Sequence, residues 1–144
     1  CSVAAFLVAC AALTPGSSVL LLLSAAAAFA TALMDTVGTE VGQALKTPTV
    51  LLPDFRRVPP GTDGAVSIGG TLAGLVAALL LAVLGFRLGL YPPSGIPVIL
   101  IAAFAGTVVE SLLGRDGAPW RVKNGHVLNF FNTLAGAALA LLLA

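Results

Sequence analysis

Residues 64–86 read GAVSIGGTLAGLVAALLLAVLGF, a run that begins with small and hydroxylated residues and continues without a charged side chain. Three more uncharged runs cover residues 1–34, 88–109 and 127–144. A helix of roughly 17–25 apolar residues spans the hydrocarbon core of a bilayer. The chain is 58% hydrophobic and 9% charged, whereas a soluble domain has roughly 25% charged residues. We therefore predict an all-α, multi-pass membrane protein with a single transmembrane domain over residues 1–144.

Prolines, glycines and polar clusters divide the chain into five expected helices. The first precedes a turn at residues 14–18 and has only thirteen residues. Because this is too short to span a bilayer, we interpret it as the remainder of a longer, N-terminally truncated helix. The other four helices are expected over residues 18–44, 65–86, 96–113 and 126–144.

The expected loops alternate between the two faces of the membrane. Loops 44–64 and 114–126 share one face, which carries six of the seven basic residues, whereas only Arg87 lies on the other. The six are Lys46, Arg56, Arg57, Arg115, Arg121 and Lys123. Cytoplasmic loops are enriched in Lys and Arg. We therefore predict that the polar loops face the cytoplasm of a bacterium or the stroma of a plastid, from the bacterial cytoplasmic membrane or a plastid membrane.

The sequence contains an internal repeat. Thr71-Leu-Ala-Gly74 recurs as Thr133-Leu-Ala-Gly136, and nine of twelve positions are identical between residues 71–82 and 133–144. Alanine and leucine are common in such chains, so part of this identity reflects composition. The order of the surrounding features is more specific than the identities themselves.

Each copy of the repeat follows a helix that ends near a glutamate, Glu40 or Glu110, and then a charged loop. Two helices separate the copies, so both units cross the membrane in the same direction. We predict two parallel helix-loop-helix repeats, over about residues 18–86 and 96–144. In proteins built from such repeats, the functional site lies at the interface between them.

Three carboxylates lie near the ends of expected membrane helices. They are Asp35 and Glu40, at the end of the second helix, and Glu110, at the end of the fourth. Ionisable groups at membrane depth are costly and are usually functional, and carboxylate oxygens suit Mg²⁺ that is carried by phosphates. The alternative is that these carboxylates meet water at the interface or pair with Arg56 or Arg121.

A glycine-rich loop, PPGTDGAVSIGG over residues 59–70, leads into the third expected helix and follows Arg56 and Arg57. Backbone N–H groups at a helix N-terminus bind anions, and the arginine fork matches phosphate oxygens. The loop lacks the Gly-Lys-Ser/Thr ending of a Walker A motif. A plain tight turn explains the glycines equally well.

Two asparagines, Asn129 and Asn132, lie three residues apart in the fifth expected helix. An amide within the membrane needs a hydrogen-bond partner. The two amides are interpreted as ligands of a phosphate or diphosphate, or as contacts that hold the fifth helix against the third. His126 is interpreted as an interfacial cap, with a general base as the alternative.

Together these motifs resemble a multi-pass membrane family that includes plant phytyl-phosphate kinase. The match covers about residues 31–144, and the combination is specific although no single motif is. The motifs are DTVGTEVG (residues 35–42), VPPGTDGAVS (58–67), GTLAG (70–74), ESLLG (110–114) and the segment 124–136, which ends in NTLAG. Family members are longer at the N-terminus, which agrees with a truncated first helix.

The resemblance implies a kinase that uses Mg²⁺ with a nucleoside triphosphate, CTP or ATP. Its substrate would be an isoprenoid phosphate lipid, phytyl phosphate or similar, converted to the diphosphate for prenylquinone or tocopherol synthesis. Under this hypothesis Mg²⁺ is bound by the three carboxylates Asp35, Glu40 and Glu110. The phosphates are bound by Arg56, Arg57, Gly61, Gly64, Ser67, Asn129 and Asn132. The lipid bilayer is the other partner, and no basic run indicates nucleic acid.

The alternative function is a membrane transporter or exchanger, because parallel repeats with intramembrane carboxylates also build secondary carriers. A carrier needs polar groups near the midplane and access from both faces. Here one face carries only Arg87. The concentration of polar residues at the other face favours the kinase, and it also argues against a scaffold without chemistry.

Overall fold

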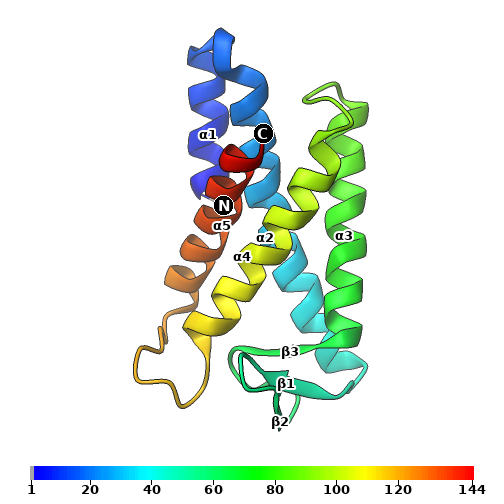
Figure 1. Cartoon of the computed structure of the whole chain (residues 1–144), viewed down its shortest axis with the longest axis vertical. Coiled ribbons are helices and arrows are strands. Elements are labelled where there is room, and N and C mark those ends of the chain that lie inside the picture. The colour runs from blue at the N-terminus through cyan, green and yellow to red at the C-terminus, as the bar shows by residue number, and fades with distance from the viewer. Residues whose placement is uncertain (1) are drawn as a thin grey trace.

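The computed structural model describes residues 2–144 and places five α-helices side by side (Figure 1). Four of the described helices are long and apolar enough to cross a membrane, and only α1 is too short. The helices are α1 (Ser2–Leu13), α2 (Ser18–Ala44), α3 (Ile68–Arg87), α4 (Gly95–Gly114) and α5 (Gly125–Leu143), with a 3-10 turn at Pro15–Ser17. The predicted helical, multi-pass membrane architecture is confirmed. The truncation of the first helix stays a prediction.

Successive helices run in alternating directions (Figure 1). The segments between α2 and α3 and between α4 and α5 therefore lie together at one end of the molecule, which we call the polar end. The hairpins α2–α3 and α4–α5 run in the same direction. The division into two repeats stays a prediction, as does the compartment that the polar end faces.

The segment between α2 and α3 contains a small sheet, which an all-α prediction does not include. Three-residue strands pair antiparallel in the order β2-β1-β3, and the central Thr49 lies opposite both Val58 and Ser67. The strands are β1 (Thr49–Leu51), β2 (Arg56–Val58) and β3 (Ala65–Ser67). Strands this short show no readable alternation of polar and apolar residues, and four prolines indicate only a loop.

The third helix begins at Ile68 rather than at Ala65 because residues 65–67 belong to β3. Ser67 keeps an extended backbone and caps the helix, since its Oγ accepts a hydrogen bond from the Gly70 N–H at 3.1 Å. A capping hydroxyl satisfies one of the helix N–H groups that lack an intrahelical partner. The sheet therefore joins α3 without an intervening loop.

Helix α2 is central and packs against each of the other four helices. At two glycines of α3, its contact with α3 brings the two backbones directly together. A methyl group at Gly70 would overlap the carbonyl oxygen of Gly38, and one at Gly74 would lie 2.5 Å from that of Met34. Small residues four apart allow such close approach of membrane helices. The α2–α3 hairpin is therefore held by a glycine contact.

Two turns farther from the polar end, α2 contacts α4 and α5 around Thr31, which is fully buried. A methyl group at Gly106 or at Gly136 would overlap the Thr31 side chain. At Gly106 it would also lie 2.8 Å from the carbonyl oxygen of Asn132. The Thr31 side chain thus packs against glycines of both α4 and α5, and this contact fixes the two helices relative to α2.

Tyr91 closes the end of the molecule opposite the polar end. Its hydroxyl donates a hydrogen bond to the Ala82 carbonyl oxygen at 2.9 Å, and burial raises the pKa of the Tyr91 phenol. The ring fills the space left by Gly85 and Gly95, where an added methyl group would meet it. The short turn between α3 and α4 is therefore anchored by one aromatic side chain.

We expect Asn124→Ala to lower the free energy of unfolding by about 1 kcal/mol, because it removes an N-cap. The Asn124 Oδ1 accepts hydrogen bonds from the N–H groups of His126 and Val127 at 2.9 and 3.3 Å. Ser94 precedes α4 in the same position but makes no capping bond with its side chain. Ser94→Ala is therefore the control and should leave the midpoint of thermal unfolding in detergent unchanged. Equal losses from both variants would contradict this assignment.

Candidate functional site

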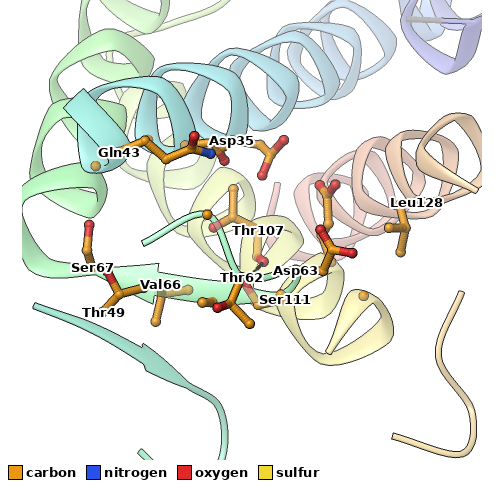
Figure 2. A pocket seen from close by; sticks show the side chains of 18 of the residues that line it. Asp35, Gln43, Thr49, Thr62, Asp63, Val66, Ser67, Thr107, Ser111 and Leu128 are labelled. Carbon is orange, nitrogen blue, oxygen red and sulfur yellow. Dashed lines mark hydrogen bonds between the residues drawn. The ribbon is translucent and has the colours of Figure 1, made fainter. Parts of the chain in front are cut away.

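A cavity of about 340 Å³ lies at the polar end, between the α2–α3 and α4–α5 hairpins. In Figure 2, Asp35 and Gln43 project into it from α2, with Thr107 and Ser111 of α4 on another wall. Further walls come from the sheet, from the loop between β2 and β3, and from the start of α5. The ionisable side chains among the described lining residues are Asp35, Asp63, Glu110 and Lys123.

Asp35 and Glu110 lie next to each other among the residues that line the cavity. Both are half-buried, and their carboxyl groups are close enough to interact. Each belongs to a helix that is long enough to span the membrane. The two carboxyl groups come from different hairpins, so they meet only because α2 and α4 pack together.

Glu40 does not join this pair. It is exposed and does not line the cavity, because five residues of an α-helix turn the side chain by about 140° from Asp35. Within residues 2–144, no group of three or more His, Cys, Asp or Glu side chains is close enough to hold a metal ion. The arrangement brings together two of the three carboxylates that the sequence indicated.

The glycine-rich loop reaches the cavity as the sequence suggested. Gly61, Gly64 and Ser67 all line it. Gly61 and Gly64 have φ values of 88° and 73°, a left-handed conformation that L side chains rarely adopt. A methyl group at Gly64 would also lie 2.6 Å from the backbone of Arg115 and from the carbonyl oxygen of Ser111. Gly64 therefore serves a close contact with the end of α4 as well as lining the cavity.

Arg56 and Arg57 lie outside the cavity. Both are exposed on the edge strand β2, and neither is among the lining residues. Lys123, just before α5, is the one basic side chain among the described residues that line the cavity, and it forms no ion pair with another described residue. The sequence carried one signal for it, a lysine directly before the Asn-Gly start of a membrane helix.

The two asparagines predicted to act together, Asn129 and Asn132, lie in different environments. Asn132 is fully buried, and its Nδ2 donates a hydrogen bond to the Glu110 Oε2. Asn129 is exposed and lies with His126 and Thr36 in a separate depression on the outside of the bundle. Neither asparagine lines the main cavity. Spacing of i, i+3 was too coarse to distinguish a buried position from an exposed one.

Two ion pairs link the two polar loops, and a third lies within the loop between α4 and α5. Arg115 pairs with Asp54 at 2.6 Å, and Arg121 pairs with Asp116 at 2.7 Å and with Asp63. The Asp116 N–H also donates to the Asp63 carbonyl oxygen at 3.1 Å. These arginines are therefore engaged by loop aspartates, and Asp35 and Glu110 make no ion pair with an arginine in residues 2–144.

Known proteins resemble the chain over most of its length. A family model described as "Integral membrane protein DUF92" matches residues 1–137. An uncharacterized membrane protein of Synechocystis sp. is 45% identical over 118 residues, which are 80% of this chain and 45% of that protein. Protein VTE6, chloroplastic, of Arabidopsis thaliana is 38% identical over 120 residues, which are 80% of this chain and 35% of that protein.

A third relative, an uncharacterized membrane protein of Methanocaldococcus jannaschii, is 31% identical over 117 residues, 79% of this chain and 48% of that protein. The chain thus spans between 35% and 48% of the length of these three relatives. No solved structure matches it. The family model covers nearly all of the chain, so the family resemblance predicted from the motifs is confirmed. The chain belongs to the integral membrane protein family DUF92.

Proposed function

We propose that the cavity is the phosphoryl-transfer site of a nucleotide-dependent kinase that converts an isoprenoid monophosphate to the diphosphate. The observation that carries this proposal is the Asp35–Glu110 pair, which opens onto a glycine-rich loop and one unpaired lysine. Phosphoryl transfer depends mainly on positioning and charge neutralisation. A site of this kind needs carboxylates for a metal and donors for phosphate, and both are present in one cavity.

The donor set fits Mg²⁺. Mg²⁺ is usually bound by one or two carboxylates together with substrate phosphates and waters, and Asp35 and Glu110 supply two carboxylates from facing helices. The described lining residues include hydroxyl oxygens but no His or Cys, which softer metals prefer. When bound with the nucleotide, Mg²⁺ would neutralise charge on the phosphates.

The protein's own groups account for binding and orientation of the phosphates. Lys123 provides a positive charge, and the backbone around Gly61 and Gly64 and the start of α3 provide N–H donors. The cavity holds the polar head of a ligand, while the exposed apolar faces of the helices accommodate an isoprenoid chain in the surrounding bilayer.

Similarity to known proteins supports the same proposal. The motifs around Asp35, residues 58–67 and Glu110 resemble the family that includes plant phytyl-phosphate kinase, and the chloroplastic protein VTE6 is 38% identical over 120 residues. We infer a bacterial cytoplasmic membrane or a plastid membrane as the location, with the polar end toward the cytoplasm or stroma. That is the compartment that supplies nucleoside triphosphates.

The test uses the full-length protein in lipid nanodiscs with phytyl or geranylgeranyl monophosphate, Mg²⁺ and labelled CTP or ATP. The expected result is an isoprenyl diphosphate that carries the label and forms only with Mg²⁺ present. The same protein in liposomes reports transport. Flux of the isoprenoid phosphate or of an ion without any diphosphate product would contradict the kinase and favour the transporter.

We expect Lys123→Met to raise KM for the phosphate substrates by about 10-fold, because one charge-assisted contact is worth roughly 1.5 kcal/mol. Methionine keeps the length and apolar stem of the lysine. Arg57→Met is the control, since Arg57 is exposed and outside the cavity, and it should change KM by less than about twofold. Steady-state kinetics in nanodiscs measures both. A larger increase in KM for Arg57→Met than for Lys123→Met would contradict the role of Lys123 and indicate that the phosphate binds near β2.

A further inference from the structure

Asn132 is an unusual side chain for its place in the fold. It lies in the middle of α5, is fully buried, and is surrounded by the contacts between α2, α4 and α5. Its Nδ2 donates to Glu110, whereas its Oδ1 has no hydrogen-bond partner in the described chain. Burying an amide oxygen without a partner destabilises a protein. Packing alone therefore does not account for an asparagine here.

Asn132 is also out of reach of a ligand. It does not line the cavity, whereas Glu110 does. A phosphate in the cavity would meet Lys123 and the glycine-rich loop, which line it. Asn132 contacts the Glu110 carboxylate but does not line the cavity. Any influence of Asn132 on the cavity is therefore exerted through Glu110.

The helices hold Asn132 and Glu110 in register. Gly106, one turn before Glu110 on α4, leaves no room for a side chain between α4 and the Asn132 carbonyl oxygen. Gly136, one turn after Asn132 on α5, is packed equally closely against Thr31 of α2. These two glycine contacts on either side fix the amide against the carboxylate, so the hydrogen bond has a defined geometry.

We propose that Asn132 is a positioning residue, whose amide fixes one oxygen of Glu110 so that the other is presented to a divalent cation in the cavity. The inference rests on the proposed function of the Asp35–Glu110 pair, and it replaces the role of phosphate ligand. Residues that orient a metal-binding carboxylate typically affect metal affinity or activity by about 10–100-fold when they are changed.

The decisive variant is Asn132→Leu, which keeps the branching and the number of side-chain heavy atoms and removes both the amide donor and the unpaired oxygen. In the full-length protein we expect kcat to fall by about 10–100-fold and the Mn²⁺ affinity, followed by electron paramagnetic resonance, to fall by a similar factor. KM for the isoprenoid phosphate should stay within about twofold. The thermal midpoint should not fall. Asn129→Leu, an exposed asparagine three residues away, is the matched control and should change none of these.

A spectroscopic measurement separates this proposal from the proposed function. The infrared band of the Glu110 carboxyl group, identified by its loss in Glu110→Gln, is recorded without substrate. It should move to higher wavenumber in Asn132→Leu, and Asn132→Ala serves as the second variant if the leucine side chain does not pack. If the band moves but the unchanged protein has no kinase activity, the hydrogen bond between Asn132 and Glu110 is supported and the kinase function is contradicted. An unmoved band, or a raised KM with unchanged kcat, overturns the positioning role.

Discussion

Glu110→Gln should lower kcat for diphosphate formation by at least about 100-fold, because removal of one preorganised electrostatic group commonly costs about 10²–10³ in rate. Glutamine keeps the shape of the side chain and an oxygen that can accept from Asn132, but it lacks the negative charge that would bind Mg²⁺ under the proposed function. Asp35→Asn should have an effect of similar size, since the two carboxyl groups face one cavity. Rates are measured over a range of Mg²⁺ concentrations, so that weaker metal binding is separated from slower chemistry.

Glu40→Gln is the control for both variants. Glu40 lies on the same helix as Asp35 but is exposed and outside the cavity. Its kcat and KM should remain within about twofold of the unchanged protein. Full activity of the Asp35 or Glu110 variant would remove the metal assignment, and loss of activity in the Glu40 variant would place the chemistry elsewhere at the polar end.

Gly70→Ala should destabilise the protein by about 3 kcal/mol or more. A methyl group at Gly70 would overlap the Gly38 carbonyl oxygen and lie 2.9 Å from the Ser67 Oγ that caps α3. Overpacking costs about 1–3 kcal/mol and loss of a cap about 1 kcal/mol. In an ordinary helix the same change would stabilise by roughly 0.5–1 kcal/mol. Thermal unfolding in detergent, followed by circular dichroism, gives the difference.

Gly16→Ala provides the comparison, because nothing lies within 4 Å of a methyl group added there. Its unfolding midpoint should match that of the unchanged protein. The Gly70 variant should also elute as a broader or aggregated species, since α3 must move away from α2 to make room. An unchanged midpoint for Gly70→Ala would show that the two backbones are farther apart than described here.

The membrane helices are readable from the sequence because each is a long run without charge. The predicted bounds 18–44 and 96–113 agree with α2 and α4 to within one residue at each end. The prediction for α3 began three residues early, since Ala65–Ser67 is apolar enough to continue a helix but pairs with β1 instead. That pairing joins segments about fifteen residues apart, which a local pattern does not reveal.

The part of the candidate site that was predictable from the sequence consists of residues whose position in the chain places them at the polar end. Asp35, Glu110 and the glycine-rich loop end at the same edge of the membrane because the helices alternate in direction, and all reach the cavity. Glu40 and Arg57 lie toward the same end of the molecule, but both are exposed and neither lines the cavity. The position of a residue along the membrane normal follows from counting residues. The direction of its side chain depends on helix rotation and strand pairing, which only the packed structure supplies.

Gly64 has a consequence for how the cavity keeps its size. Its backbone rests on the end of α4, and the neighbouring Asp63 carbonyl oxygen accepts from the Asp116 N–H. The loop is thus a spacer of fixed length between the two hairpins, in addition to being part of the wall. Deleting one residue near Thr62 would draw α4 toward α3 and shrink the cavity, whereas inserting one would widen it. Under the proposed function, loop length, more than side-chain identity, would then set the largest head group that the cavity admits.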